Sequence, residues 1–405
     1  MGFAELWESL LPVGRHGGTG GYRRYSFTEA DSACRQWFMK TAAQRGLRVD
    51  QDRNGNLWAW WDCQNPARGA IVTGSHLDSV PDGGAFDGPL GVVSAFAALD
   101  QLRARGLAPG RPVGVAAFCE EEGARFGVAC LGSRLLTGAL DPRAARGLTD
   151  GAGVSLAEAM TRAGLDPAAI GPDDDLLGGI ASYVELHIEQ GSALAGLDAA
   201  VGLAEGIWPH GRWRLEFTGR ADHAGTTRIP DRRDPMLPFA ATVLAARQAA
   251  AEHAALATIG KVTAEPGGAN AICSAVRCWL DARAPDQATL QRVTAQVTTA
   301  ARAAAAEQQV SLSVSQESVT PPVRFDAVLR DQLAGALARR GVTAPVLPTG
   351  AGHDAGVLAA RLPTAMLFVR NPSGVSHSPG EHADPADCAA GVTALAAVLE
   401  ELAFR

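Results

Sequence analysis

The segment at residues 74–88, GSHLDSVPDGGAFDG, gathers side chains that could do chemistry: His76, Asp78, Asp82 and Asp87. The apolar run at 70–73 before it is typical of a buried strand, and open α/β sheets present their reacting groups where such strands end. Histidine and carboxylate side chains offered together suit a divalent metal such as Zn, Mn or Co. A solvated acidic loop is the simpler alternative for this segment alone.

Three consecutive glutamates, Glu120, Glu121 and Glu122, follow a second apolar run at 112–118. Carboxylates repel one another, so a buried cluster of them needs a cation. Because adjacent residues point in different directions, one carboxylate can ligate a metal while its neighbour acts on a water as general base. An exposed helix N-terminus, where acidic side chains are favourable, is the alternative.

The segment ELHIEQG at 185–191 carries the next histidine. A strand period of two places Glu185, His187 and Glu189 on one face. A lone histidine there would more often be a core residue with a satisfied hydrogen bond. In company with the other clusters, we interpret His187 as a metal ligand.

Two further clusters lie near the C-terminus. The small residues around the GHD segment at 352–354 let a backbone N–H approach a substrate anion closely. The SHSPGEH segment at 376–382 follows a strand-like run at 364–369 and offers another histidine. All the clusters together supply enough ligands for two metal ions with a bridging carboxylate. No G-x-S-x-G elbow, G-x-G-x-x-G or P-loop favours a serine nucleophile or a nucleotide cofactor.

The elements that must position these clusters alternate between apolar strands and Ala/Leu-rich helices. We expect helices at 32–43 and 90–104, and strands at 57–62, 70–73, 112–118, 183–188 and 364–369. This rhythm predicts an α/β domain with a mostly parallel sheet and helices on both faces. The polar region at 141–175 is expected to form short helices and loops.

A different pattern begins near residue 206. It follows the order β-α-β-β-α-β, with strands at 213–217, 256–263, 275–283 and 310–314 and helices at 237–254 and 287–308. That order is typical of a ferredoxin-like unit. We therefore predict a catalytic domain made of residues 1–205 and 317–405, interrupted by a smaller α+β domain at 206–316.

Composition narrows the class of protein. The 405 residues are 47% hydrophobic and 20% charged, which is ordinary for a soluble globular chain. The net charge of −7 argues against nucleic-acid and anionic-membrane partners. No apolar run approaches the ~18 residues of a spanning helix, and no signal peptide is evident, so we expect a cytoplasmic protein. The seven scattered cysteines are typical of reduced thiols.

These collinear motifs resemble the N-carbamoyl-L-amino-acid hydrolase and allantoate amidohydrolase branch of the binuclear metallo-aminoacylase and carboxypeptidase superfamily. The resemblance runs from DRNGN at 52–56 through HAGTT at 223–227 to SHSPGE at 376–381, and so covers nearly the whole chain. Peptidases of the superfamily usually carry an acid where this chain has His187, so this histidine points to the carbamoylase branch.

The resemblance implies two divalent metal ions per subunit, which can be Mn, Zn, Co or Ni. One ion would be held by His76, Asp87 and His187. The second would be held by Asp87, Glu122 and His377, which makes Asp87 the bridge between them.

The resemblance also assigns catalytic roles. Glu121 would be the general base that deprotonates the attacking water and then protonates the leaving nitrogen, and Asp78 would orient His76. The inserted domain would be a lid and dimerisation domain, in a homodimer where one subunit's histidine polarises the scissile carbonyl in the partner subunit's site. The implied substrate contacts are Gln190, His223, Asn270, Arg283 and Gly352, of which His223 is the residue that crosses the interface.

The chain departs from its relatives near the lid, where Cys273 and Arg228 stand at positions that are commonly proline. These departures leave the fine substrate preference open, and the sequence does not determine which metal is bound or whether the lid is open. We expect hydrolysis of the ureido C–N bond of an N-carbamoyl-L-amino acid or a related small ureido acid, with release of CO2, ammonia and the free amino compound. The alternatives are allantoate hydrolysis, then an aminoacylase or dipeptidase, and remotely an inactive metal-binding regulator.

Overall fold

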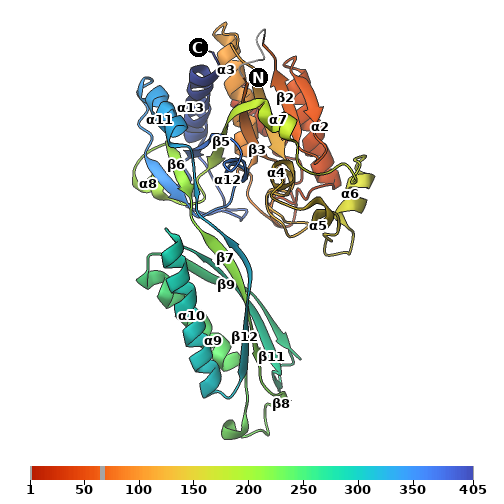
Figure 1. Cartoon of the computed structure of the whole chain (residues 1–405), viewed down its shortest axis with the longest axis vertical. Coiled ribbons are helices and arrows are strands. Elements are labelled where there is room, and N and C mark those ends of the chain that lie inside the picture. Colours follow the sequence, from red (N-terminus) through yellow and green to blue (C-terminus); the bar gives the residue numbers. More distant parts are fainter. Residues whose placement is uncertain (1, 64–68, 405) are drawn as a thin grey trace. The chain divides into compact units, whose positions relative to one another are not determined.

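The computed structural model describes residues 2–63 and 69–404. The chain divides into two compact units, which we call the sheet unit (1–206 and 324–405) and the insert unit (207–323). Figure 1 labels the elements of both. Strand β12 (Ser311–Thr320) belongs to the insert unit.

The sheet unit is built on a nine-stranded sheet. Its order is β1-β2-β4-β3-β5-β15-β6-β13, with β14 paired to β6. The strands are β1 (Arg48–Gln51), β2 (Leu57–Trp61), β3 (Ala70–His76), β4 (Val113–Phe118), β5 (Ile180–Ile188), β6 (Val201–Ile207), β13 (Val323–Arg324), β14 (Val346–Thr349) and β15 (Thr364–Val369). The four central strands β4, β3, β5 and β15 run parallel, as predicted, and β1, β2 and β6 pair antiparallel.

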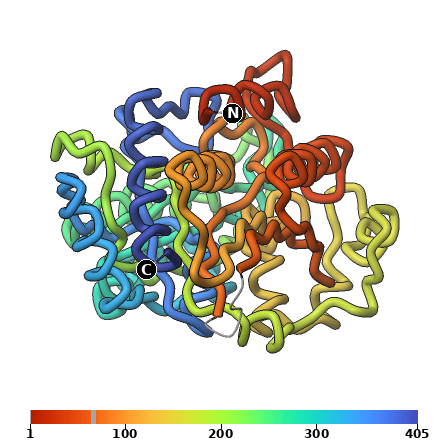
Figure 2. Tube along the Cα trace, turned by 90° about the horizontal axis from the view of Figure 1, so that it is seen from above, coloured from red at the N-terminus to blue at the C-terminus, as the bar shows by residue number. Residues whose placement is uncertain are grey.

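Long helices supply much of the sheet unit's apolar core. They are α1 (Phe3–Leu10), α2 (Glu29–Ala43), α3 (Pro89–Ala104), α11 (Ala327–Ala338) and α13 (Pro385–Ala403). Helix α3 is apolar nearly all round and packs against α13, β3 and β5; Figure 2 shows α3 and α13 as neighbours. The approach to the sheet is close because Gly91 has no side chain: a Cβ there would lie 2.2 Å from the carbonyl oxygen of Leu186.

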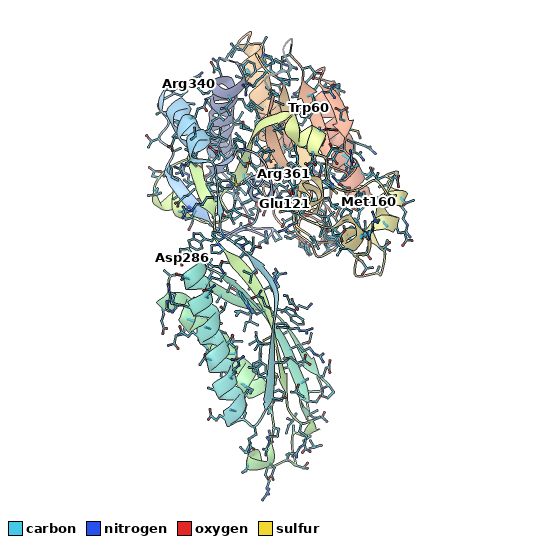
Figure 3. All side chains as sticks on the ribbon, in the orientation of Figure 1. Trp60, Glu121, Met160, Asp286, Arg340 and Arg361 are labelled. Carbon is cyan, nitrogen blue, oxygen red and sulfur yellow. The ribbon has the colours of Figure 1, made fainter. Side chains whose placement is uncertain are left out.

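A second, smaller core lies among short helices, partly within the region at 141–175 that was expected to contain short helices and loops. These helices are α4 (Leu131–Thr137), α5 (Pro142–Arg146), α6 (Leu156–Arg162) and α7 (Asp174–Gly178), and α8 (Ala193–Gly196) and α12 (Asp354–Leu358) lie further along the chain. Met160, labelled in Figure 3, is buried there with Phe126 and Leu135. Helix α12 contacts α4.

The insert unit holds a four-stranded antiparallel sheet in the order β12-β7-β11-β9. Its elements are β7 (His210–Thr218), β8 (Asp222–His223), the 3-10 helix η2 (Ile229–Asp231), α9 (Met236–Glu252), β9 (Leu256–Glu265), β10 (Ala271–Ile272), β11 (Ala275–Arg283), α10 (Gln287–Glu307) and β12. Helix α10 begins where the Asp286 carboxylate accepts the backbone N–H of Thr289. Burial alternates along β11, so one face of the sheet packs against α9 and α10.

No helix within residues 2–63 and 69–404 is long and apolar enough to cross a membrane.

Candidate active site

The candidate site lies at the carboxyl ends of the four parallel strands. His76 is the last residue of β3, and His187 is the last but one of β5. Glu121 and Glu122 follow β4, and His377 follows β15. Because parallel strands end at the same edge of a sheet, these side chains converge although they are far apart in sequence. The sequence placed His76 in a loop after a strand ending at 73, whereas β3 extends through it.

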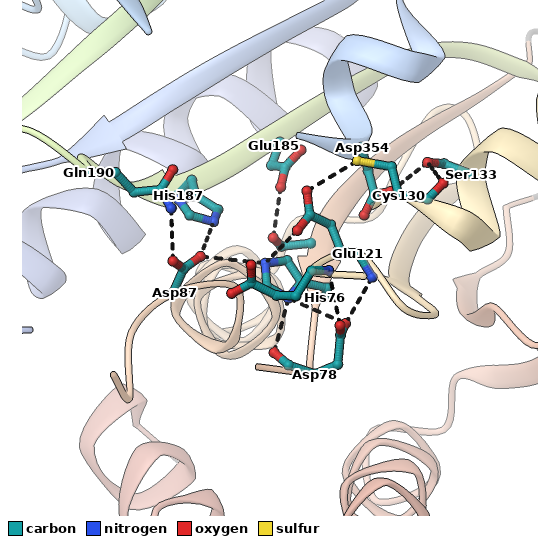
Figure 4. Close-up of polar contacts among 12 residues, drawn as sticks. His76, Asp78, Asp87, Glu121, Cys130, Ser133, Glu185, His187, Gln190 and Asp354 are labelled. Carbon is teal, nitrogen blue, oxygen red and sulfur yellow. Dashed lines mark hydrogen bonds and ion pairs between the residues drawn. The ribbon is translucent and has the colours of Figure 1, made fainter. Parts of the chain in front are cut away.

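A first group of potential ligands joins His76, Asp87 and His187, whose donor atoms lie within 4.8 Å of one another. The Asp87 Oδ1 atom is 3.1 Å from His187 Nε2 and 3.6 Å from His76 Nε2 (Figure 4). Each ring uses its other nitrogen on a backbone carbonyl: His76 Nδ1 is 3.1 Å from the Asp78 oxygen, and His187 Nδ1 is 2.8 Å from the Ile188 oxygen.

These contacts define the tautomer of both rings. A carbonyl only accepts, so each Nδ1 carries the proton and each Nε2 presents a lone pair. Within the described residues, Nε2 of His76 and Nε2 of His187 are buried and make no hydrogen bond. Two lone pairs that converge on the Asp87 carboxylate without a donor suit a cation.

A second group joins Asp87, Glu122 and His377 within the same 4.8 Å limit. His377 Nε2 is 3.4 Å from Asp87 Oδ2 and 3.5 Å from Glu122 Oε2. Glu122 Oε1 is buried and, in the described part of the chain, has no hydrogen-bond partner. The two oxygens of Asp87 thus face two different groups, so this carboxylate lies where the sequence analysis expected a bridge.

A glycine allows the Asp87 loop to reach His76. Gly88 has φ +84°, and a Cβ at this position would lie 2.4 Å from Cε1 of the His76 ring. Helix α3 begins at the next residue, Pro89, whose fixed φ suits the first helical position. The loop therefore turns into α3 with its backbone pressed against a candidate ligand.

Neighbouring side chains shift the pKa values of the residues in the second group. Burial would raise the pKa of Asp87, but its contacts with His187, His377 and His76 hold that pKa well below the usual range. Burial and the neighbouring Asp87 raise the pKa of Glu122 to about 7. The contact with Asp87 raises the pKa of His377 to about 9. Buried carboxylates gathered beside histidine nitrogens are the electrostatic setting of a cation site.

Glu121 is placed beside the first group. Its carboxylate is buried, with Oε2 3.7 Å from His76 Nε2 and Oε1 3.2 Å from the Cys130 Sγ. Burial raises the pKa of Glu121 well above that of a free glutamate. A carboxyl group with a raised pKa is suited to take up a proton and return it.

Asp78 makes contacts that the sequence did not suggest. Its two carboxylate oxygens accept the backbone N–H groups of Glu121 and Glu122 at 3.1 and 3.0 Å. The nearer Asp78 atom to His76 Nδ1 is the carbonyl oxygen at 3.1 Å, while Oδ1 is 3.5 Å away. The carboxylate therefore holds the loop after β4, and both the carbonyl and the carboxylate of Asp78 lie beside Nδ1 of His76.

Two of the expected substrate contacts belong to the sheet unit. Gln190 donates from Nε2 to Asp87 Oδ2 at 2.8 Å, and its buried Oε1 has no partner in the described residues. Gly352 is exposed and precedes His353, whose ring packs edge-on against His187 with centroids 4.5 Å apart. Both positions therefore adjoin the ligand groups.

The other three expected contacts belong to the insert unit and do not lie together. His223 on β8 is exposed, and the next residue donates its N–H to the carbonyl of Asn270. Strand β11 begins at Ala275, shortly after β10 along the chain, and Arg283 is at its other end. Nine strand residues span about 26 Å at about 3.3 Å per step. Within one chain, a small substrate cannot touch both Arg283 and the His223–Asn270 pair.

The structure adds neighbours of the site for which no role was predicted. Ser376 donates from Oγ to Asp87 Oδ2 at 3.2 Å. Glu185 accepts from Ser75 Oγ at 2.7 Å and from the Ala355 N–H at 3.0 Å. Ser376 could have been noticed as the neighbour of His377 in the SHSPGE motif. Cys130 carried no sequence signal.

Proteins of known family and structure resemble this chain over most of its length. The model of Peptidase family M20/M25/M40 matches residues 72–401. An N-carbamoyl-L-amino acid amidohydrolase of Geobacillus stearothermophilus is 36% identical over 98% of each chain. An allantoate amidohydrolase of Escherichia coli (strain K12) is 32% identical over 100% of this chain and 99% of its own. A hydantoinase/carbamoylase family amidase from Burkholderia vietnamiensis has a similar solved structure, with TM-score 0.87, 31% identity and coverage of 98% of this chain and 97% of its own.

Proposed function

The chain belongs to Peptidase family M20/M25/M40, and we propose that within this family it is a metal-dependent amidohydrolase for ureido acids. The reaction is hydrolysis of the ureido C–N bond of an N-carbamoyl-L-amino acid or a related compound, with release of CO2, ammonia and the free amino compound. One observation carries the proposal: the Nε2 atoms of His76 and His187, which make no hydrogen bond within the described residues, converge on Asp87 beside a buried glutamate. The name of the Geobacillus relative supports the substrate class.

The donor set fits two divalent ions. We assign one to His76, Asp87 and His187 and the other to Asp87, Glu122 and His377. Imidazole nitrogens and carboxylate oxygens suit Mn, Zn, Co and Ni alike. Such ions, when bound, polarise a carbonyl oxygen and lower the pKa of water.

The chain's own residues account for proton movement. Glu121 takes the proton of the attacking water on Oε2, the oxygen nearer His76, and gives it to the leaving nitrogen. Asp78 keeps this carboxylate in place through the backbone of Glu121 and Glu122. His187 occupies a position where related peptidases carry an acid, which favours a ureido substrate over a peptide.

The insert unit is proposed to be the lid and dimerisation domain of a homodimer. Strand β9 is at the edge of its sheet and exposes Val262 by 50%, and α9 exposes Leu237 by 54% and Leu244 by 70%. Unpaired strand edges and gathered apolar side chains are typical of surfaces that associate. A homodimer also explains the separated contacts: a substrate held by Arg283 of one chain would meet His223 of the partner subunit and Asn270 of the partner subunit. The cytoplasmic location stays a prediction.

The proposal is tested by ammonia release from Mn-reconstituted protein. The panel contains N-carbamoyl-L-amino acids, allantoate and, scored by free amine, N-acetyl-amino acids; the Glu121→Gln variant serves as control against contaminating activity. Preference for a carbamoyl amino acid supports the proposal. Preference for allantoate assigns the chain to the alternative ureido substrate. Turnover of N-acetyl compounds alone, or of none, overturns it.

A further inference from the structure

Cys130 lies beside Glu121 but belongs to neither ligand group. Its Sγ is 3.2 Å from Oε1 of Glu121, and the cysteine is buried at 3% exposure (Figure 4). Among the residues that the structure describes, this is the one hydrogen bond that the Glu121 carboxylate accepts. The other oxygen, Oε2, is the one that approaches His76. The two oxygens of the base thus have different partners.

The backbone holds the thiol in this place. The Cys130 N–H donates to the Glu121 carbonyl at 2.6 Å, and two further bonds join the same segments: Leu131 N–H to Glu120 O at 3.0 Å and Gly132 N–H to Cys119 O at 2.9 Å. Cys130 has φ +55°, a left-handed conformation that L-residues other than Asn and Asp seldom adopt. Such a conformation persists only where the surroundings determine it, and here three backbone bonds do so.

The chemistry of the contact requires a donor. Burial raises the pKa of the Cys130 thiol well above its usual value, so the sulfur carries its proton at neutral pH. On the same side, the Asp354 carboxylate already accepts from Ser133 Oγ at 2.5 Å. Among the described residues, the side-chain acceptor within hydrogen-bond distance of the sulfur is Oε1 of Glu121, at 3.2 Å.

We propose that Cys130 is a positioning residue: its S–H donates to Oε1 of Glu121 and so leaves Oε2 as the oxygen that exchanges the proton. This inference rests on the proposed role of Glu121 as general base. It goes beyond that role because it predicts which Glu121 oxygen exchanges the proton and which side chain holds the other oxygen.

Three variants test the inference by steady-state kinetics. Cys130→Ala removes the donor, Cys130→Ser keeps one, and Cys34→Ala deletes a buried thiol of helix α2 that makes no hydrogen bond to Glu121 among the described residues. We expect Cys130→Ala to lose about tenfold in kcat with KM within about twofold, since tenfold corresponds to one weak hydrogen bond made in the transition state. Cys130→Ser should stay within about threefold of the wild type, and Cys34→Ala should match it.

An infrared measurement of the S–H stretch needs no activity. The Cys130 band, isolated as the difference between wild type and Cys130→Ala, should lie at lower frequency than the Cys34 band, isolated in the same way. It should move to higher frequency in Glu121→Gln, because a neutral amide is a weaker acceptor. The same metal content per subunit in all variants excludes an effect through the ligands.

Three results would overturn the inference. They are a Cys130 band at the frequency of a thiol without a hydrogen bond, wild-type kcat in Cys130→Ala, and a Cys130→Ser variant as slow as Cys130→Ala. If the wild type hydrolyses nothing in the panel, the proposed function fails by itself, and the S–H band still decides the hydrogen bond.

Discussion

Replacement of Gly88 by alanine tests how tightly the Asp87 loop is packed against a candidate metal ligand. The new Cβ would lie 2.4 Å from Cε1 of His76, where ordinary contacts begin at 3.4 Å, so the ring or the loop must move by about 1 Å. Relief of such overlap costs about 1–3 kcal/mol in a packed site. The backbone at φ +84° adds about 1–2 kcal/mol for an L-residue. The expected loss of stability is therefore about 2–5 kcal/mol.

Gly106 provides a matched control at the other end of the same helix. It has φ +72°, but a Cβ there would meet nothing within 4 Å. Gly106→Ala should therefore show the backbone term alone, about 1–2 kcal/mol. Urea unfolding of the metal-free proteins measures both losses, because metal binding would otherwise add to the difference.

The metal content of the two variants tests whether the displaced His76 ring can still bind an ion. Metal–ligand distances vary by only about 0.2 Å, so a ring displaced by about 1 Å cannot keep its ion. We expect Gly88→Ala to lose metal and activity and Gly106→Ala to keep both, as measured by mass spectrometry of bound metal and by kcat/KM. Equal stability of the two variants, with metal retained in Gly88→Ala, would refute the reasoning.

Three further predictions concern the proposed reaction. Glu121→Gln should keep the metals and the fold but lose about 10²–10⁴-fold in kcat, as expected for removal of a general base; wild-type turnover would contradict that role. His223→Ala should cripple turnover while gel filtration still shows a dimer. Mixing it with Glu121→Gln under subunit exchange should restore activity, because the mixed dimer contains one complete site; no recovery would argue against a site shared between subunits. Chelation should abolish turnover and lower the melting temperature, and Mn should restore both; full activity after verified metal loss would contradict a metal-dependent reaction.

Much of the site was predictable because its chemistry is local in sequence. The period of two in ELHIEQG puts His187 and Glu185 on one strand face, and the structure finds both buried there. His76 and Glu121 each accompany a run of apolar residues, which predicts a strand end in a parallel sheet. The two Ala-rich helices of the insert could also be predicted, because alanine strongly favours the helix, and Asp286 caps the start of α10.

Other contacts could not be predicted because they join distant parts of the chain. The Asp78 carboxylate meets the backbone N–H groups of residues 43 and 44 positions away, and no local pattern of either segment encodes that pairing. The thiol of Cys130 faces Glu121 because a left-handed residue and three backbone bonds join two loops. Asn270 and Arg283 were expected to hold one substrate carboxylate, but β11, which separates Arg283 from the Asn270 segment, spans about 26 Å, and sequence motifs do not show that separation.

The sequence by itself determined the kinds of ligand, the parallel strands that carry them and the pattern of the inserted elements. These follow from side-chain type and from periodicity, which act between near neighbours along the chain. Only the tertiary structure decided which oxygen of Asp87 faces which histidine, and which oxygen of Glu121 contacts the Cys130 thiol. Those choices depend on packing at the sheet edge, where strands and loops far apart in sequence meet within a few ångströms.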